Sequence, residues 1–179
     1  FLIFSVTTAL PSAIDQMSLE EKVGQLLIVH FHGKQANDIS ERLISEAHVG
    51  GFIYYEWSNA LQNFSQVCSL SNQLQEQNRK HNDLPLFIAT DQEGGDVTRL
   101  KKEFTHFPSA HELGKLNTPA LAYMVAKAQA DELKFAGLNM NFAPVADITC
   151  PSGNSMIGRR SYGTDPLKVA QYVRSSVAG

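Results

Sequence analysis

The sequence predicts an α/β protein with parallel strands, because short apolar runs alternate with helix-like segments four times along the chain. The runs are residues 26–29, 50–55, 86–90 and 139–145, and each has the apolar character typical of a buried strand. Right-handed crossovers between such strands leave two common architectures, an open doubly wound sheet or a (β/α)8 barrel. No G-x-G-x-x-G motif follows the first run, which disfavours a dinucleotide-binding sheet. A complete barrel has eight strand–helix units and usually needs about 250 residues, so the four units in this chain of 179 residues would be half of one.

The first half of the chain predicts two helix–strand repeats and the helix that leads to the third strand. Ser18 and Glu21 have the spacing of a capping box, which predicts a short helix through Val23 before the strand at 26–29. A helical stripe formed by Ile39, Leu43 and Ile44 precedes the strand at 50–55. A longer helix leads to the third strand and ends before Pro85, and its apolar positions are Leu61, Phe64, Val67, Leu70 and Leu74.

The second half predicts one long loop, two helices and the fourth strand. The loop contains residues 107–109, and the helix after it has an apolar face made of Leu121, Met124, Val125, Ala128 and Phe135. Gly137 predicts the end of that helix, since glycine is the usual residue after a helix C-terminus. After the fourth strand, Asp165 and Pro166 predict the start of a last amphipathic helix over residues 167–177.

Composition excludes several classes of protein. With 43% hydrophobic and 18% charged residues, the chain is expected to be globular and not disordered. The net charge is −3 and the basic residues are scattered, so we expect no nucleic-acid partner. Cys68 and Cys150 form no C-x-x-C pattern, which leaves a single disulfide between them open. His30 and His32 could point to one face of a strand end, but no third ligand stands near them, so we expect no metal and no cofactor.

Residues 1–16 form an apolar leader that is distinct from residues 17–179. The stretch 1–10 is apolar and Pro11 ends it, which is similar to the end of a secretory signal peptide. The alternative is an N-terminal segment packed on the body of the protein. The leader is too short to span a bilayer, so we expect no stable membrane insertion. The chain starts without Met and ends inside a helix-like segment, so both ends are expected to be truncated.

Residues 86–99 carry the strongest indication of a site. An apolar strand ends at Thr90, and Asp91, two glycines and Arg99 follow it. The carboxyl ends of parallel strands form the active-site face of barrel enzymes, and Gly94 and Gly95 allow the backbone to turn sharply beside a ligand. A carboxylate and a guanidinium together suit a ligand rich in hydroxyl groups. The alternative is an ordinary acidic turn.

Four segments in this order and spacing resemble one family. They are residues 17–26 (MSLEEKVGQL), 91–95 (DQEGG), 141–147 (NFAPVAD) and 157–163 (IGRRSYG). Together they resemble the catalytic domain of glycoside hydrolase family 3, in its β-N-acetylhexosaminidase (NagZ-type) branch. This bacterial branch trims N-acetylglucosamine from peptidoglycan fragments in peptidoglycan recycling, and its Gram-negative members are typically cytoplasmic, whereas the apolar leader favours export. The resemblance runs from about Met17 to the end of the chain.

The resemblance implies a TIM-type (β/α)8 barrel, of which about the first four βα units are present. It also implies that Asp91 binds hydroxyls of the terminal sugar and that Arg99 and Arg160 help to hold that sugar. The chemistry agrees, because an ionised carboxylate accepts two hydroxyl hydrogen bonds and guanidinium offers several fixed donors. The alternatives are a turn-capping role for Asp91 and a surface salt bridge for Arg160. Glu93 and Asp147 are expected to orient loops or to cap a helix.

Asp96 departs from the family pattern, which usually has arginine after the paired glycines. The acidic residue reverses a charge beside the pocket and bears on the preferred substrate.

The resemblance places both chemical groups of the reaction beyond this chain. In this branch a retaining mechanism uses an aspartate nucleophile from a later strand and a histidine acid/base from the loop after the fifth strand. Their motif, of the type KHFPGHG, does not follow Arg160, and residues 106–108 do not match it because they precede the fourth strand and lack the glycines. We therefore expect the catalytic aspartate and histidine C-terminal of Gly179, and no turnover by this chain alone.

The sequence thus predicts part of a glycosidase that removes terminal β-linked N-acetylglucosamine through a covalent glycosyl-enzyme. One alternative is a β-glucosidase-like exo-glycosidase of the same family, and another is a catalytically inactive sugar-binding fragment. Half a barrel has an unpaired strand edge, so the isolated chain is expected to self-associate.

Overall fold

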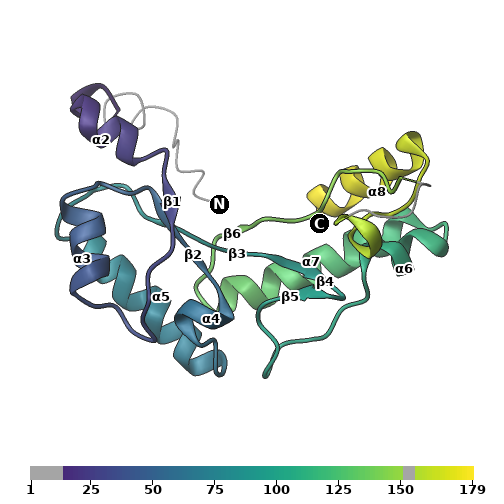
Figure 1. Cartoon of the computed structure of the whole chain (residues 1–179), viewed down its shortest axis with the longest axis horizontal. Helices are drawn as coiled ribbons and strands as arrows, with labels where there is room; N and C mark the ends of the chain where they lie inside the picture. The colour runs from purple at the N-terminus through teal and green to yellow at the C-terminus, as the bar shows by residue number, and fades with distance from the viewer. Residues whose placement is uncertain (1–13, 151–155) are drawn as a thin grey trace, which may run out of the picture.

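A four-stranded parallel sheet forms the centre of the molecule (Figure 1). The computed structural model describes residues 14–150 and 156–179. The strands are β1 (Ile28–Val29), β2 (Gly51–Tyr54), β3 (Phe87–Thr90) and β6 (Met140–Asn141), which lie in the order β1-β2-β3-β6. All three pairings are parallel, with Gly51 opposite Phe87 and Tyr54 opposite Thr90. The predicted parallel arrangement is confirmed. Of the leader at residues 1–16, residues 1–13 lie outside the described residues.

Helices connect the successive strands of the sheet, as the sequence predicts. Between the first three strands lie α3 (Asp38–Ser45), the short α4 (Glu56–Asn59) and α5 (Phe64–Asn78). Helix α2 (Leu19–Gly24) precedes β1, and α7 (Pro119–Phe135) precedes β6. Figure 1 shows α3 and α5 side by side at one end of the molecule, and α7 running along β3 and β6. Helix α8 (Pro166–Ala178) packs on α7.

The predicted helix ends are confirmed. Glu21 N–H donates to Ser18 Oγ at 3.1 Å and Ser18 N–H donates to Glu21 Oε2 at 2.7 Å, which completes the capping box of α2. Asp165 Oδ1 accepts from Leu167 N–H at 2.9 Å, so α8 begins at Pro166 as expected. Gly137 follows α7 with a φ of 80°.

The apolar side chains form two cores. The larger lies between the sheet and helices α3 and α5, and it includes Ile44, Phe52, Leu70, Leu74 and Ile88. The smaller joins helices α6 (Ala110–Lys115), α7 and α8, and its members are Leu113, Ala122, Tyr162, Val169 and Tyr172. The rings of Tyr162 and Tyr172 stack with their centroids 4.9 Å apart.

Four predicted details are wrong. Leu61 is buried but lies before α5, which begins at Phe64 and is capped by Asn63. The first strand begins at Ile28, and Leu26 is 83% exposed, because the chain leaves α2 in a turn closed by Leu26 N–H and Val23 C=O. On α7, Met124 and Phe135 are exposed, while Ala122, Gln129 and Leu133 are buried. The fourth strand, β6, is only two residues long. Its hydrogen bonding to β3 ends before Pro144, which has no N–H to donate.

The predicted long loop after β3 is partly ordered into regular elements. It contains a hairpin of β4 (Gln92–Gly94) and β5 (Val97–Thr98), followed later by α6. Ser109 and Glu112 form a capping box at the start of α6. Among the described residues, no helix combines the length and apolar character required to cross a bilayer.

Candidate functional site

A polar pocket of about 460 Å³ lies where the strands of the sheet end. Tyr55 follows β2, Asp91 follows β3 and Phe142 follows β6, so three neighbouring strands deliver residues to it. This is the carboxyl edge of the sheet, where α/β enzymes bind their ligands. The lining residues are Ile53, Tyr55, Asp91, Glu93, Val97, Arg99, Phe142 and Arg160.

Asp91 and Arg99 meet in this pocket, as the sequence predicts. Arg99 Nη2 lies 3.0 Å from Asp91 Oδ2, and Nε lies 3.4 Å from the same oxygen. Both hydrogen bonds end on Oδ2, and Oδ1 accepts none from the described residues. Both side chains are partly exposed to the pocket. The pair therefore presents a carboxylate oxygen and guanidinium N–H groups to a ligand at the same time.

Gln92 holds Arg99 in place. Its side chain is buried, and Oε1 accepts from the backbone N–H groups of Arg99 and Leu100, each at 3.0 Å. Its Nε2 donates to Leu100 C=O at 2.9 Å. Its backbone exchanges two hydrogen bonds with the side chain of Asn141 on β6, at 2.9 and 3.0 Å. Gln92 therefore ties the backbone of Arg99 and Leu100 to β6.

The paired glycines form the turn between β4 and β5. Their φ angles are 92° for Gly94 and 58° for Gly95, which confirms the expectation from sequence. A Cβ atom would lie 2.5 Å from Pro108 O at Gly94 and 2.5 Å from Ser109 Cβ at Gly95. The residues before α6 thus approach the hairpin too closely for any larger side chain.

Arg160 enters the pocket from a different segment and pairs with Glu93. The pair is bidentate, with Nη2–Oε1 at 2.7 Å and Nε–Oε2 at 2.9 Å, and the Glu93 side chain is only 7% exposed. The hydrogen bond to Glu93 raises the pKa of Arg160, and the charges of Glu93, Asp91 and Asp147 add to this, while burial acts in the opposite direction. Arg160 is therefore held as a cation in a fixed orientation.

The neighbouring arginine shows the contrast. Arg159 pairs with Glu112 at 3.1 Å, and both of these side chains are about half exposed. An exposed surface salt bridge was the alternative role predicted for Arg160, and it is Arg159 that makes one. Asp147 is exposed, and its backbone C=O accepts from Ser161 Oγ at 2.6 Å. Asp96 is exposed at the hairpin turn and does not line the pocket.

The two histidines near the pocket lie in an aromatic environment. The ring centroids of His30 and His32 are 5.7 Å apart, and both rings contact Trp57. Within residues 14–150 and 156–179 there is no group of three His, Cys, Asp or Glu side chains suited to a metal ion. Cys68 carries a free thiol, so it is not joined to Cys150.

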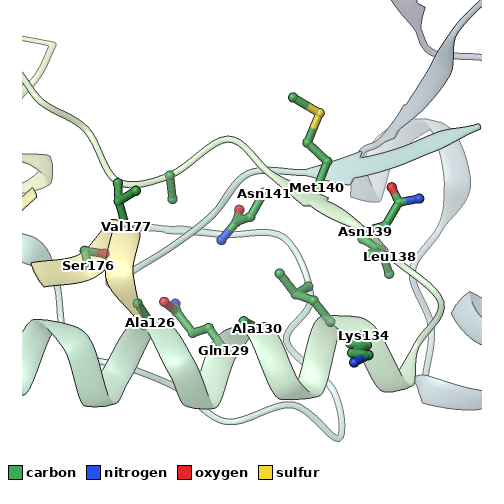
Figure 2. A pocket seen from close by; sticks show the side chains of 13 residues that line it. Ala126, Gln129, Ala130, Lys134, Leu138, Asn139, Met140, Asn141, Ser176 and Val177 are labelled. Carbon is green, nitrogen blue, oxygen red and sulfur yellow. The ribbon is translucent and has the colours of Figure 1, made fainter. Parts of the chain in front are cut away.

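A second cavity, of about 510 Å³, lies between β6, α7 and α8 (Figure 2). Figure 2 places Ala126, Gln129 and Ala130 of α7 opposite Asn141 of β6. Its lining is mainly apolar, and Lys134 is its one ionisable side chain among the described residues. The first pocket, with two carboxylates and two guanidinium groups, is therefore the candidate site.

Comparison with known proteins identifies the family. Residues 18–179 match the glycosyl hydrolase family 3 N terminal domain. The chain belongs to this family. It is 37% identical over 139 residues to β-hexosaminidase A of Pseudoalteromonas piscicida, covering 75% of this chain and 23% of that protein. It is 29% identical over 164 residues to β-hexosaminidase LpqI of Mycobacterium tuberculosis, covering 91% of this chain and 40% of that protein.

Solved structures of the family share the fold. A family 3 β-N-acetylglucosaminidase from Paenibacillus sp. FPU-7 is 43% identical with a TM-score of 0.85, and the match covers 90% of this chain and 30% of that one. A β-N-acetylhexosaminidase from Beutenbergia cavernae is 30% identical with a TM-score of 0.78, covering 91% and 50%. The family 3 α/β fold of TIM-barrel type is confirmed. The chain spans between 23% and 50% of the length of these four relatives.

Several residues of the pocket were missed by the sequence analysis. Ile53, Tyr55 and Phe142 line it, and Gln92 supports it from the core. Tyr55 ends the predicted strand at 50–55, and that position is the signal that could have found it. Ile53 and Phe142 lie inside the predicted strands at 50–55 and 139–145 and gave no such signal. The role of Gln92 had a weaker signal, an amide between two acidic residues directly after a buried strand.

Proposed function

We propose that the protein containing this chain removes terminal β-linked N-acetylglucosamine with retention of configuration, and that the polar pocket binds the terminal sugar. The observation that carries the proposal is the Asp91–Arg99 pair, which lies at the end of β3 in a chain whose relatives include β-hexosaminidases. Asp91 accepts hydrogen bonds from sugar hydroxyls, and Arg99 and Arg160 donate to sugar oxygens. Peptidoglycan fragments are the proposed source of the sugar.

The charges of the pocket support binding of a neutral sugar. Asp91 and Glu93 are matched by Arg99 and Arg160, so the four groups leave no net charge. Charge-assisted hydrogen bonds are stronger than neutral ones, and the paired arrangement holds each donor and acceptor before the sugar arrives. Glu93 acts as a positioning residue, because its two oxygens are both engaged by Arg160.

The same pairing argues against a chemical role for these carboxylates. A retaining glycosidase needs a nucleophile and an acid/base on opposite sides of the scissile bond. Arg99 engages Asp91 and Arg160 engages Glu93, which suits substrate binding better than nucleophilic attack. We therefore propose that the nucleophilic aspartate and the acid/base histidine lie C-terminal of Gly179.

Hydrolysis assays test this proposal. The full-length gene product and the 179-residue chain are each incubated with nitrophenyl N-acetyl-β-glucosaminide and with nitrophenyl β-glucoside. Release of nitrophenol from the N-acetylglucosaminide by the longer protein alone supports the proposal. Preference for the glucoside would support the β-glucosidase alternative, and activity in the short chain would make Asp91 and Glu93 the first candidates for the nucleophile.

The isolated chain is also proposed to self-associate. Strand β6 is an outer strand of the sheet and pairs with β3 alone among the described residues, and an apolar cavity lies between β6, α7 and α8. Unpaired strand edges template association between chains. Sedimentation velocity of the isolated chain is expected to show oligomers at micromolar concentration, and a monomer that unfolds cooperatively would contradict this. The net charge of −3, with scattered basic residues, argues against a nucleic-acid partner.

A further inference from the structure

Four aromatic side chains form a continuous group beside the polar pocket. The rings of Tyr55 and Trp57 stack, with centroids 5.3 Å apart and planes 14° from parallel. The ring of His30 meets that of Trp57 edge-on, with centroids 4.8 Å apart, and the centroids of the His32 and Trp57 rings are 5.5 Å apart. We call Tyr55, Trp57, His30 and His32 the aromatic row.

The aromatic row begins inside the sugar pocket. Tyr55 lines that pocket, and the guanidinium carbon of Arg99 lies 5.7 Å from the centroid of its ring. From there the row continues to Trp57, in the short helix α4 after β2, and to His30, directly after β1. The row therefore leads outward from the Asp91–Arg99 pair along the ends of the first two strands.

Trp57 is exposed, although the short helix α4 that carries it is anchored to the rest of the protein. Its side chain is 63% exposed, which is unusual for the largest aromatic residue. Helix α4 is anchored by the buried Asn59, whose Nδ2 donates to Phe31 C=O at 3.2 Å and to Gly33 C=O at 3.1 Å. The buried Asn59 and Ser58 face the interior, so the adjacent Trp57 is presented to solvent.

A pyranose ring matches this surface. One face of a β-linked pyranose exposes mainly C–H groups, which pack on an aromatic face, while its hydroxyls reach neighbouring polar atoms. The imidazole rings of His30 and His32, whose centroids lie 4.8 and 5.5 Å from that of Trp57, carry nitrogens that offer such atoms. A rigid aromatic anchor also loses little conformational entropy when a ligand binds.

We propose that the aromatic row is a second sugar subsite, which binds the sugar unit attached to the terminal residue. The inference rests on the proposed function and names its substrate class: N-acetylglucosamine β-linked to a second pyranose, of which a β-linked N-acetylglucosamine disaccharide is the simplest neutral example. Asp91, Arg99 and Arg160 hold the terminal residue, and Trp57 holds its neighbour. Glycosides with a small alkyl group in place of the second sugar do not use the subsite.

The test compares two substrates in the full-length protein. The wild type and Trp57→Ala are assayed on N,N′-diacetylchitobiose and on methyl N-acetyl-β-glucosaminide. We expect Trp57→Ala to lower the ratio of kcat/KM for the disaccharide to that for the methyl glycoside about tenfold, equal to about 1.4 kcal/mol. The loss should be mainly in KM, since stacking contributes equally to ground and transition states. Trp57→Phe should keep most of the ratio, because it keeps an aromatic face.

Phe135→Ala is the matched control. Phe135 is an exposed aromatic residue at the end of α7, before β6 begins and thus at the opposite edge of the sheet. It should leave the ratio unchanged.

The outcomes separate the two proposals. A wild type that hydrolyses neither substrate overturns the proposed function and the subsite with it. A wild type that hydrolyses both, with the same ratio in Trp57→Ala, overturns the subsite and leaves the proposed function standing. An equal loss on both substrates together with a lower Tm would assign Trp57 a structural role and also overturn the subsite.

Discussion

Replacing Gln92 by leucine tests how the pocket is supported. The change keeps the side-chain volume close to the original but removes the buried amide, which pairs with three backbone groups: Arg99 N–H, Leu100 N–H and Leu100 C=O. An unsatisfied buried polar group costs about 1–3 kcal/mol. The two groups of Leu100 are buried, whereas Arg99 lies near solvent and should contribute least. We therefore expect Gln92→Leu to destabilise the protein by about 3 kcal/mol.

Urea unfolding of the full-length protein measures this loss, and glycosidase kinetics measure its effect on the site. Because Arg99 is displaced and the reacting groups are elsewhere, KM should rise while kcat stays close to the wild-type value. Gln129→Leu is the matched control, since Gln129 is also buried but makes one long hydrogen bond, to Gln92 C=O at 3.2 Å. A loss below about 1 kcal/mol for Gln92→Leu would refute the reasoning.

Three further changes probe the pocket and its supports. Glu93→Gln removes the charge that holds Arg160 and should raise KM about fivefold, because a partly exposed charged hydrogen bond contributes about 1 kcal/mol; an unchanged KM would show that Arg160 does not touch the sugar. Gly95→Ala should lower the stability by at least about 2 kcal/mol, since alanine disfavours a φ of 58° and its Cβ would overlap Ser109; thermal unfolding measures this, and a Tm equal to that of the wild type would contradict it. The pKa of Glu112 is lowered, first by its hydrogen bonds from Ser109, so its contribution to stability is present above pH 4.5 and lost as the pH falls below it. Glu112→Gln keeps the cap without a titrating group, and the fall in urea midpoint between pH 6 and pH 3 should be smaller than in the wild type.

Local patterns in the sequence were sufficient for the order and type of the main elements. Strand-like and helix-like periodicities depend on neighbouring residues, and so do the caps at Ser18 and Asp165, which form within a few residues of the helix start. The position of Asp91 at the end of β3 was predictable for the same reason. Arg99 lies only eight residues further on, so a single hairpin brings it back to Asp91.

The exposed and buried faces of the helices were less predictable. Met124 and Phe135 continue the apolar stripe of α7, but the buried positions of the helix are others: Ala122 packs in the smaller core with α6 and α8, and Leu133 packs in the larger core. Gln129 is buried because its side chain reaches Gln92 C=O, a contact that no helical periodicity reports. The hairpin of β4 and β5 was missed because its strands are too short to show a period.

By itself, the sequence determined the alternation of strands and helices, the helix caps and the strand end that carries Asp91, because each leaves a pattern in residues near one another in the chain. That alternation was enough to predict parallel strands, since each connection contains a helix. The tertiary structure alone decided that Glu93 meets Arg160, 67 residues away, and that Tyr55 lines the pocket with Trp57 stacked on its ring. Parallel strands bring their carboxyl ends to one edge whatever their separation in sequence, so the chemistry at that edge depends on which segments the fold places there.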